Sequence, residues 1–440
     1  MKGIIKLRKT SNIFYFLIFI LSFLALLFLD DKNIILFNIE FSFDRINTMF
    51  AFLANLVFFL FNLLSKNSIR KFQHIFYPLS MILIILFNII LFTNSITLVF
   101  LGLFFIFLIN YFLTKSKSTF SFDISTLFFS FVLISYGLLR YFSLNSISFS
   151  FLNIAQYQYR IDEFIINIAF FGFLILIFRL FNLLPYNLKA KNSHILGFNT
   201  MLYFVLGCNL LIKMFSIFSY YFYKNQSIIA LYLLLNAVYF AIRQFKSKSI
   251  IEFLKLTLPL NIIISIFALF TYSQTGFISL IYSMIALILS YGAGFILSDL
   301  IEKKMGTAEF SSLKKIGHND RLIRFFIFVI FLNIAHALPC AGLFSAAFSF
   351  LNIFLTESSG LIMTFAPYIL FMCAFLLTLE AINVISKTLV EPIKPMGSFL
   401  LSFRQRFILY ILTFSLFICS FSIEYIISQF IDIAAQIGNL

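Results

Sequence analysis

Seven ionisable side chains of this sequence lie inside or at the ends of long apolar runs, where a charge is costly. They are Arg179, Lys213, Glu252, Lys255, His336, Glu380 and Glu424. Within a bilayer such residues are retained mostly where they pair, bind an ion or pass a proton. We take six of these residues, together with Lys248, as candidates for a proton path. The candidates are Arg179, Lys213, Lys248, Glu252, Lys255, His336 and Glu380.

Each candidate also has a structural interpretation. The long side chains of Arg179 and Lys213 can reach the membrane surface from late positions in their runs. Glu252 and Lys255 are three residues apart on one helical face, so they can form a structural ion pair instead of a relay. A lone helical histidine such as His336 commonly bonds a backbone carbonyl. Glu380 has no obvious local partner in its apolar run, which leaves a functional role open.

The composition defines the elements that carry these residues. The chain has 440 residues, of which 62% are hydrophobic and 11% charged, and its mean hydropathy is +1.03. A soluble domain carries about 25% charged residues. Because lipid offers no partners to the backbone, only helices or closed barrels span a bilayer. The apolar runs are continuous and about twenty residues long, which predicts helices.

We therefore expect an all-α, polytopic integral membrane protein with about thirteen spans, forming a single transmembrane helical domain over 1–440. The expected spans are 13–29, 48–64, 76–93, 96–113, 124–142, 163–184, 199–218, 227–245, 250–270, 277–298, 323–351, 361–386 and 407–424.

The loops between these spans predict the orientation. The N-terminus and every second loop after it carry 25 of the 32 basic residues, and the opposite face carries six, with Lys255 left within a span. Cytoplasmic loops are enriched in Lys and Arg. We expect the N-terminus in the cytoplasm and the C-terminus outside, in a bacterial, or bacterium-derived, inner (cytoplasmic) membrane. The net charge of +15 therefore reflects topology and does not indicate a nucleic-acid partner.

Two expected spans contain or end at helix-breaking residues. The 323–351 run is too long for one simple crossing and contains Pro339 and Gly342. Proline removes a helical hydrogen bond and clashes with the preceding turn, so we expect an interruption between residues 337 and 344. Pro185 ends the 163–184 span similarly. Broken helices can line a polar cavity, as in transporters; a kink that merely packs is the alternative.

No residue pattern indicates catalysis or a cofactor. Cys208, Cys340, Cys373 and Cys419 all lie in apolar runs without a close pair, which favours core packing over metal ligation or disulfides. We see no metal-ligand cluster, glycine-rich phosphate loop or nucleophile–base motif, and we expect no cofactor.

Several short motifs occur in an order known from one family. They are Phe43-Asp44, Leu184-Pro185, Gly207 with Lys213, Ala241-Ile-Arg-Gln244 with Lys248, Met284-Ile285-Ala286 with Ser290 and Phe295, and Leu338-Pro339-Cys-Ala-Gly342-Leu-Phe344. Together they resemble the antiporter-like subunits of proton-pumping NADH:quinone oxidoreductase (complex I) and of Mrp-type Na⁺/H⁺ antiporters. Leu184-Pro185 resembles that family's Trp-Leu-Pro-Asp turn, and Met284-Ile285-Ala286 with Ser290 resembles its Met-Ile-Ala-His-x-Leu-Ser helix. The segment from Leu338 to Phe344 resembles the family's Pro-x-x-Gly-Phe break.

The resemblance implies an antiporter-like core over about 48–430, without one of the family's fourteen core helices. It also implies a non-catalytic membrane subunit that works beside other membrane subunits of a respiratory or antiporter complex. The positions of the family's proton-carrying residues are all apolar here, however. They fall on Phe104, Leu174, Val205, Leu287 and Ala347, so the resemblance implies the fold together with a degenerate proton path.

Two other functions remain open. A free-standing multispan transporter or lipid-linked flippase could use the basic loops to contact anionic lipid. A membrane enzyme such as a polysaccharide polymerase is disfavoured, because that class carries large, charged exterior loops and the exterior loops here hold few charges.

Overall fold

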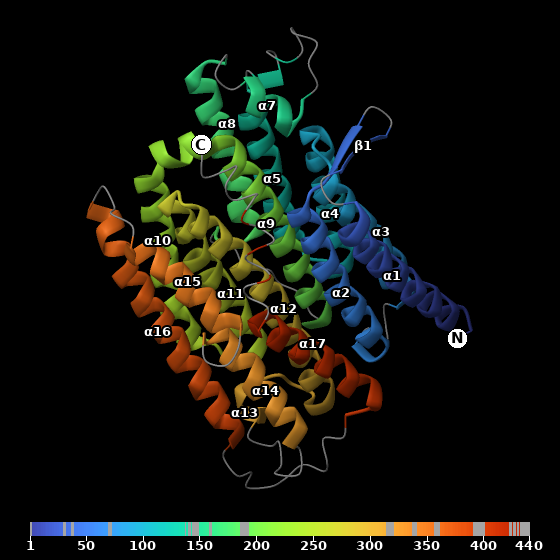
Figure 1. The fold of residues 1–440 in the computed structure, drawn as a ribbon. Helices are drawn as coiled ribbons and strands as arrows, with labels where there is room; N and C mark the ends of the chain where they lie inside the picture. Colours follow the sequence, from blue (N-terminus) through green and yellow to red (C-terminus); the bar gives the residue numbers. More distant parts are fainter. Residues whose placement is uncertain are drawn as a thin grey trace. The chain divides into compact units, whose positions relative to one another are not determined.

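A computed structural model gives the arrangement of the helices (Figure 1). It describes residues 2–29, 32–36, 39–68, 73–136, 138–139, 142, 149–157, 161–184, 193–313, 321–336, 341–355, 361–389, 401–421, 425, 428 and 431. The expected single domain groups into two compact units, Met1–Lys224 and Asn225–Leu440, which we call unit 1 and unit 2.

The named elements of unit 1 in the described residues are helices and one short hairpin. Its elements are α1 (Lys2–Phe28), β1 (Lys32–Leu36), β2 (Ile39–Phe43), α2 (Arg45–Ser68), α3 (Gln73–Phe92), α4 (Ile96–Thr114), α5 (Lys117–Ser135), α7 (Phe151–Tyr157), α8 (Glu163–Leu180) and α9 (Ser193–Lys224). Within unit 1, α9 packs against α2 and α8, and α5 packs against α4 and α8.

The named elements of unit 2 that the structure describes are all helices, joined by short non-helical segments. Its elements are α10 (Gln226–Arg243), η2 (Gln244–Lys246), α11 (Ile250–Phe267), η3 (Ala268–Thr271), α12 (Gln274–Met305), α13 (Phe310–Leu313), α14 (Arg321–Ile334), α15 (Ala341–Leu355), α16 (Leu361–Leu389) and α17 (Phe403–Phe421). The central helix is α12, which packs against α11, α14, α15 and α17.

Twelve helices in the described part of the chain are long and apolar enough to cross a membrane. They correspond to twelve of the thirteen expected spans, which confirms the all-α membrane fold. The boundaries differ most where polar residues continue a helix beyond its apolar core. For example, α9 and α12 each have 32 residues, and α5 begins at Lys117 instead of near 124.

The remaining expected span, 323–351, consists of two shorter helices. The first, α14, ends at Ile334, and α15 begins at Ala341. Between them the described residues Ala335 and His336 form a turn, in which His336 has a left-handed φ of 57°. Neither Pro339 nor Pro185 is among the described residues.

The segment expected as the loop 30–47 contains a β-hairpin. Strands β1 and β2 pair antiparallel, with Lys32 opposite Phe43 and Leu36 opposite Ile39. The alternating apolar residues of Ile39–Phe43 suit a strand, but the signal is only a few residues long. The hairpin also reaches α3, because Phe41 forms an isolated bridge with Thr93.

Burial separates inner from outer helices in each unit. In unit 2, α12 is buried along its whole apolar length, and α11 along most of it. In unit 1, α9 is the inner helix and α1 is the most exposed, with large apolar side chains such as Leu21 turned outward. A glycine permits close packing on α9, since a Cβ at Gly207 would lie 2.6 Å from the Phe181 ring. The polar side chains on these inner helices must therefore find partners inside the protein.

Candidate functional site

Arg179 forms a buried ion pair in unit 1. Its guanidinium, on the last turn of α8, is 1% exposed, and Asp123 of α5 is 3% exposed. The Arg179 Nε donates to Asp123 Oδ1 at 2.6 Å, and a second guanidinium nitrogen bonds the same oxygen. The remaining nitrogen donates to Asn182 Oδ1 at 2.9 Å. Arg179 is therefore held by partners inside the protein.

Asp123 was not predicted from the sequence as a partner of Arg179, because it precedes the expected span 124–142 by one residue. A usable signal was present, however. Since α5 begins and α8 ends on the same side of the expected topology, opposite charges at these two positions lie at one depth. Arg179 and Asp123 are 56 residues apart in the sequence, so only the packing of α5 on α8 brings them together.

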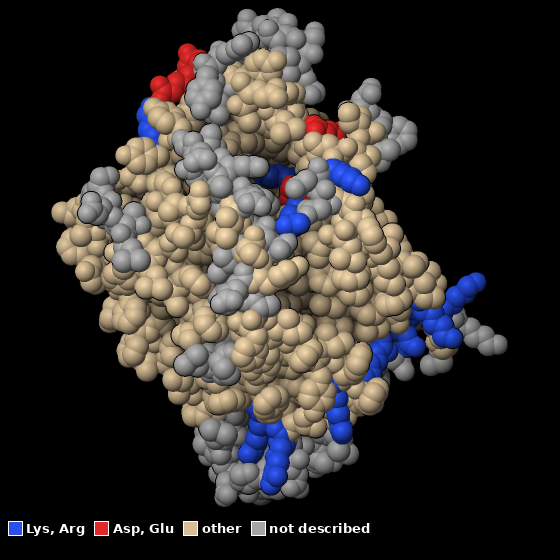
Figure 2. All heavy atoms as spheres, in the orientation of Figure 1, with Lys and Arg blue, Asp and Glu red and all other residues tan. Residues whose placement is uncertain are grey.

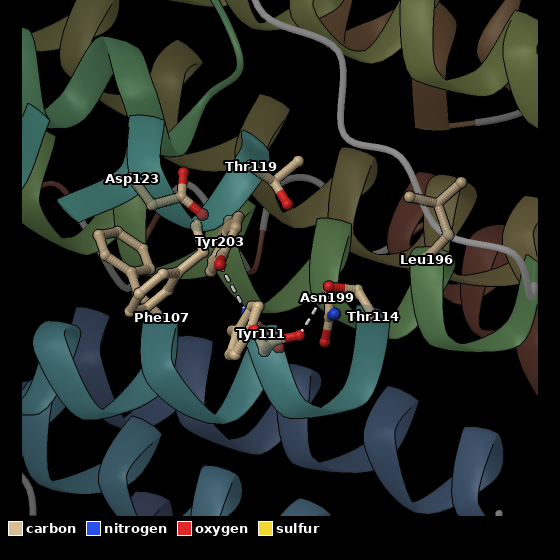
Figure 3. A pocket seen from close by; sticks show the side chains of 10 residues that line it. Phe107, Tyr111, Thr114, Thr119, Asp123, Leu196, Asn199 and Tyr203 are labelled. Carbon is tan, nitrogen blue, oxygen red and sulfur yellow. Dashed lines mark hydrogen bonds between the residues drawn. The ribbon is translucent and has the colours of Figure 1, made fainter. Parts of the chain in front are cut away.

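A small cavity adjoins this ion pair (Figure 3). It is lined by Asn110 and Thr114 of α4, Thr119 and Asp123 of α5, and Asn199 and Tyr203 of α9, together with the apolar or aromatic Phe107, Tyr111, Phe120 and Leu196. Asn110 Nδ2 donates to the Tyr203 hydroxyl at 2.5 Å. The volume of about 10 Å³ is close to what one water molecule needs. Among the described residues, the side-chain oxygens of Asn110 and Asn199 have no hydrogen-bond partner.

Lys213 of α9 lies in a second polar cluster of unit 1. Its Nζ donates to the carbonyl oxygens of Leu91 at 2.9 Å and Thr93 at 3.0 Å. Leu91 is in the last turn of α3, and Thr93 follows that helix. The ammonium also lies 5.9 Å from the centre of the Phe151 ring. Lys213 therefore neutralises the carbonyl end of a helix, which attracts cations.

A chain of amides connects this cluster to Asp44, which precedes α2. Asp44 accepts from the backbone N of Asn47 at 2.7 Å and from its Nδ2 at 2.5 Å. The Asn47 side-chain oxygen in turn accepts from Asn209 Nδ2, and Asn209 lies one helical turn before Lys213. The Phe43-Asp44 motif thus has a structural basis, because it places a carboxylate at the start of α2 and beside this network.

His336 forms hydrogen-bond contacts at the junction between α14 and α15 in unit 2. Its Nδ1 lies 3.0 Å from the carbonyl oxygen of Gly342, and its Nε2 lies 2.9 Å from Asn261 Oδ1 of α11. Asn261 Nδ2 donates to the Tyr291 hydroxyl of α12 at 2.9 Å. The imidazole therefore connects the start of α15 to two inner helices, and its backbone-carbonyl contact agrees with the structural interpretation of a lone histidine.

Gly342 is sterically required at this junction. Its backbone N donates to Asn333 Oδ1 at 2.8 Å. A Cβ at this position would lie 1.9 Å from the Asn333 carbonyl oxygen, which is far inside contact distance. The glycine therefore allows the end of α14 and the start of α15 to touch.

The other candidate residues lie elsewhere in unit 2. Glu380 of α16 is 4% exposed and accepts from Asn383 Nδ2 of the same helix at 3.1 Å. Glu252 is exposed and accepts from the backbone N of Lys248 at 3.0 Å, as a residue near a helix start does. Lys255 lies within electrostatic range of Glu252. Glu424 is outside the described residues.

Four of the five apolar positions implied by the family resemblance are at least partly interior. Leu174, Val205 and Leu287 are buried, and Ala347 is partly buried. Phe104, in contrast, is 40% exposed, whereas its neighbours Leu103 and Phe107 are buried. In α4 nearly every position is apolar, so the sequence offered no contrast between an inner and an outer face to fix this register.

Among the described residues, no group of three or more His, Cys, Asp and Glu side chains is placed to hold a metal ion. The described cysteines Cys208, Cys373 and Cys419 are free thiols buried in the helical packing.

Comparison with known proteins identifies the fold. No protein-family model matches the sequence, and no curated protein matches it significantly. Solved structures do match over nearly the full length. A chain of respiratory complex I from Thermus thermophilus superposes with a TM-score of 0.81 at 14% identity, covering 98% of this chain and 95% of the other.

Two further complexes contain chains of the same fold. A chain of the Mrp complex from Dietzia sp. DQ12-45-1b matches with a TM-score of 0.80 at 9% identity, covering 99% of this chain and 93% of that one. A chain of the membrane-bound sulfane sulfur reductase, an archaeal respiratory membrane complex, matches with a TM-score of 0.80 at 12% identity and coverages of 98% and 92%. The chain is therefore an integral membrane protein with the fold of membrane subunits from these complexes, which confirms at the level of fold the antiporter-like resemblance of its sequence.

Proposed function

We propose that this chain is a divergent antiporter-like subunit of a multisubunit respiratory or Mrp-type membrane complex, and that it carries no protons along the family's central path. One observation carries the first part. The chains that match it come from three multisubunit complexes, and each match covers more than nine-tenths of both partners. Shared architecture over the whole length supports a subunit's place in such an assembly.

The chemistry of the interior supports the second part. Leu174, Val205 and Leu287 are buried and cannot hold a proton or order a chain of water molecules. The buried cation of α8 is Arg179, and a guanidinium does not release its proton in proteins. Its pairing with Asp123 therefore supports a fixed charge and not a relay. The chain would then contribute a scaffold or a vestigial half-channel to its complex.

The distribution of basic residues supports the expected orientation. Figure 2 shows Lys and Arg atoms gathered around the start of α1 in unit 1 and near α13 and α14 in unit 2. Both places belong to the set of loops that the charge asymmetry assigns to the cytoplasm. We propose accordingly that the N-terminus faces the cytoplasm.

Co-purification from native membranes tests the assembly. The chain, tagged at its N-terminus and expressed at its natural level, would be extracted in mild detergent and separated by native electrophoresis. We expect it in a band much larger than its own 51.1 kDa, together with other membrane subunits identified by mass spectrometry. Migration as an isolated chain would contradict this proposal and favour a free-standing transporter.

Flux measurements test the missing proton path. Purified chain in liposomes with an internal pH dye is expected to show proton and sodium flux at the level of empty vesicles. Flux above that level that falls in Glu380→Gln, but not in the exposed Glu163→Gln, would overturn the proposal. Such a result would show that Glu380 belongs to a rewired path.

A further inference from the structure

The cavity beside the Arg179–Asp123 pair is bordered by polar side chains from three helices of unit 1 (Figure 3). Asn110 comes from α4, Asp123 from α5, and Asn199 and Tyr203 from α9. These four side chains are between 1% and 5% exposed. Their polar atoms must therefore find partners within the protein or in a molecule bound inside it.

Two of these side chains have an acceptor without a donor. Among the described residues, the Oδ1 atoms of Asn110 and Asn199 have no hydrogen-bond partner. The other end of the Asn110 amide is satisfied, because its Nδ2 donates to the Tyr203 hydroxyl at 2.5 Å. A buried acceptor that lacks a donor is costly. Two such acceptors on one cavity indicate an occupant that donates hydrogen bonds.

The threonine hydroxyls of the lining do not supply these donors. Thr114 Oγ1 donates to the Asn110 carbonyl oxygen at 2.8 Å, and Thr119 Oγ1 donates to the Ser116 carbonyl oxygen at 2.8 Å. Each threonine has a single hydroxyl hydrogen, so both hydrogens are used in these bonds. The Tyr203 hydroxyl accepts from Asn110 and retains its own hydrogen to donate. The cavity therefore suits an occupant that donates two hydrogen bonds and accepts one.

Charge and volume select water among the small donors. The Asp123 carboxylate is balanced by the Arg179 guanidinium, so the cavity does not require a further positive charge. Its volume of about 10 Å³ is close to what one water molecule needs and leaves no room for a row of them. Water donates two hydrogen bonds and also accepts, whereas a metal ion cannot accept the hydrogen of Tyr203.

We propose that this cavity binds one water molecule, which donates to the side-chain oxygens of Asn110 and Asn199 and accepts from the Tyr203 hydroxyl. The water connects α4 to α9, beside the ion pair that connects α5 to α8. This water site is independent of the chain's place in a complex. It is also independent of the proton path, because one molecule does not form a chain of water.

Radiolytic labelling of the full chain tests the site. A short X-ray pulse converts water into hydroxyl radicals, and a water bound in the interior labels the side chains beside it where bulk solvent does not reach. In water enriched in the heavy oxygen isotope, mass spectrometry reports the label on each tyrosine. We expect Tyr203 to be labelled several-fold more than Tyr77 and Tyr282, which are also buried but bond Ser65 Oγ and the Cys419 carbonyl oxygen. Equal labelling of the three tyrosines in the native chain would overturn the site.

Substitutions of Asn199 make this result specific. Asn199→Leu places an apolar group of similar size against the water and should lower the Tyr203 label to the level of Tyr77. Asn199→Ser keeps a polar atom and enlarges the cavity, so the label should stay or rise. The control Asn236→Leu, on α10, removes a bond to the Tyr232 carbonyl oxygen and should leave the Tyr203 label unchanged.

Two further outcomes would contradict the water site. One is a Tyr203 label that is as strong in folded Asn199→Leu as in the native chain. The other is a Tyr203 label that falls when sodium or potassium chloride replaces choline chloride, since that would assign the cavity to a cation. If Asn199→Leu does not fold, the comparison of the native tyrosines and the response of Asn199→Ser still decide the question.

Discussion

The buried charges of unit 1 depend on one another. Arg179 and Asp123 lie in the interior, where each would carry a large desolvation cost alone. The Asp123 oxygen that faces the guanidinium accepts two bonds from it, and Asn182 satisfies a third nitrogen. At this scale, stability is governed by whether both partners are present.

Removing one partner should therefore cost more than removing both. We expect Asp123→Asn to reduce the stability of the chain by about 3–5 kcal/mol, because it leaves a buried guanidinium without a counter-charge. The double variant Asp123→Leu/Arg179→Met, which removes both charges, should be closer to the native chain. Thermal unfolding monitored by thiol exposure measures both.

The exposed pair Lys224–Glu163 provides the control. Both side chains are about half exposed, so Glu163→Gln should leave the unfolding temperature almost unchanged. A loss in Asp123→Asn no greater than that in Glu163→Gln would show that the buried pair contributes little.

The contact partners of the buried ionisable residues were the feature least predictable from the sequence. Ionisable residues inside apolar runs could be identified, because a bilayer makes them conspicuous, and Arg179, Lys213 and Glu380 are in fact interior or partly so. The partners of these residues could not be predicted, because Asp123, Leu91 and Asn261 come from distant parts of the chain. In addition, Asn261 is uncharged and Leu91 contributes only its backbone carbonyl oxygen. The sequence did not predict that Phe104 points outward, because α4 is apolar on all faces and so gives no sign of which face is buried.

Helices and their interruptions follow more directly from sequence. Continuous apolar runs gave twelve spans, because the hydrocarbon thickness fixes their length. The division of 323–351 into α14 and α15 was predicted from excess length and the Pro339–Gly342 pair, because both disfavour one continuous helix. The expected bounds of 337–344 were placed too late, since α14 ends at Ile334 and α15 begins at Ala341. The hairpin β1–β2 was not predicted, because each strand has only five residues and its pairing depends on the neighbouring end of α3.

The junction between α14 and α15 gives a prediction about an element. Gly342→Ala places a methyl group where the Asn333 carbonyl oxygen lies, so the two helix ends must separate. We expect a loss of about 3 kcal/mol, the upper end of ordinary single substitutions. Limited proteolysis and thermal unfolding of the purified variant measure the loss.

Gly306→Ala is the control that separates the cost of steric overlap at Gly342 from the cost of an unfavourable backbone conformation. Gly306 has a left-handed φ of 78°, and a Cβ there would meet nothing within 4 Å. Its substitution should cost only about 1 kcal/mol for the disfavoured conformation. An effect of Gly342→Ala as small as this one would mean that the junction can absorb a methyl group.

At the scale of the whole molecule, the charge asymmetry predicts which ends of the helices face the cytoplasm. We expect a cysteine introduced at Ser312, in α13, to resist a membrane-impermeant thiol reagent in intact cells and to react after the cells are opened. The native cysteines would be replaced by alanine. The same topology predicts that Thr275→Cys, at the start of α12, reacts in intact cells.

These two positions test the orientation together. Thr275 is exposed, so its replacement leaves the helix core intact, and it removes only the hydroxyl's bonds to Asn352 Oδ1 at 2.6 Å and Ser273 Oγ at 3.1 Å. Labelling of the Ser312 variant from outside, with the Thr275 variant protected, would invert the proposed topology.

The difference in burial between α1 and α12 has a consequence for how such a chain diverges over time. A side chain of α1 that touches lipid needs only to be apolar, so Phe, Leu and Ile can replace one another there at little cost. Every side of α12 is packed against protein, and close packing penalises a change of even one methylene. Mutations are therefore expected to accumulate faster on α1 than on α12. Among relatives of this chain, we expect identical residues to concentrate on α9, α11 and α12, while the lipid-facing helices retain only their hydrophobicity.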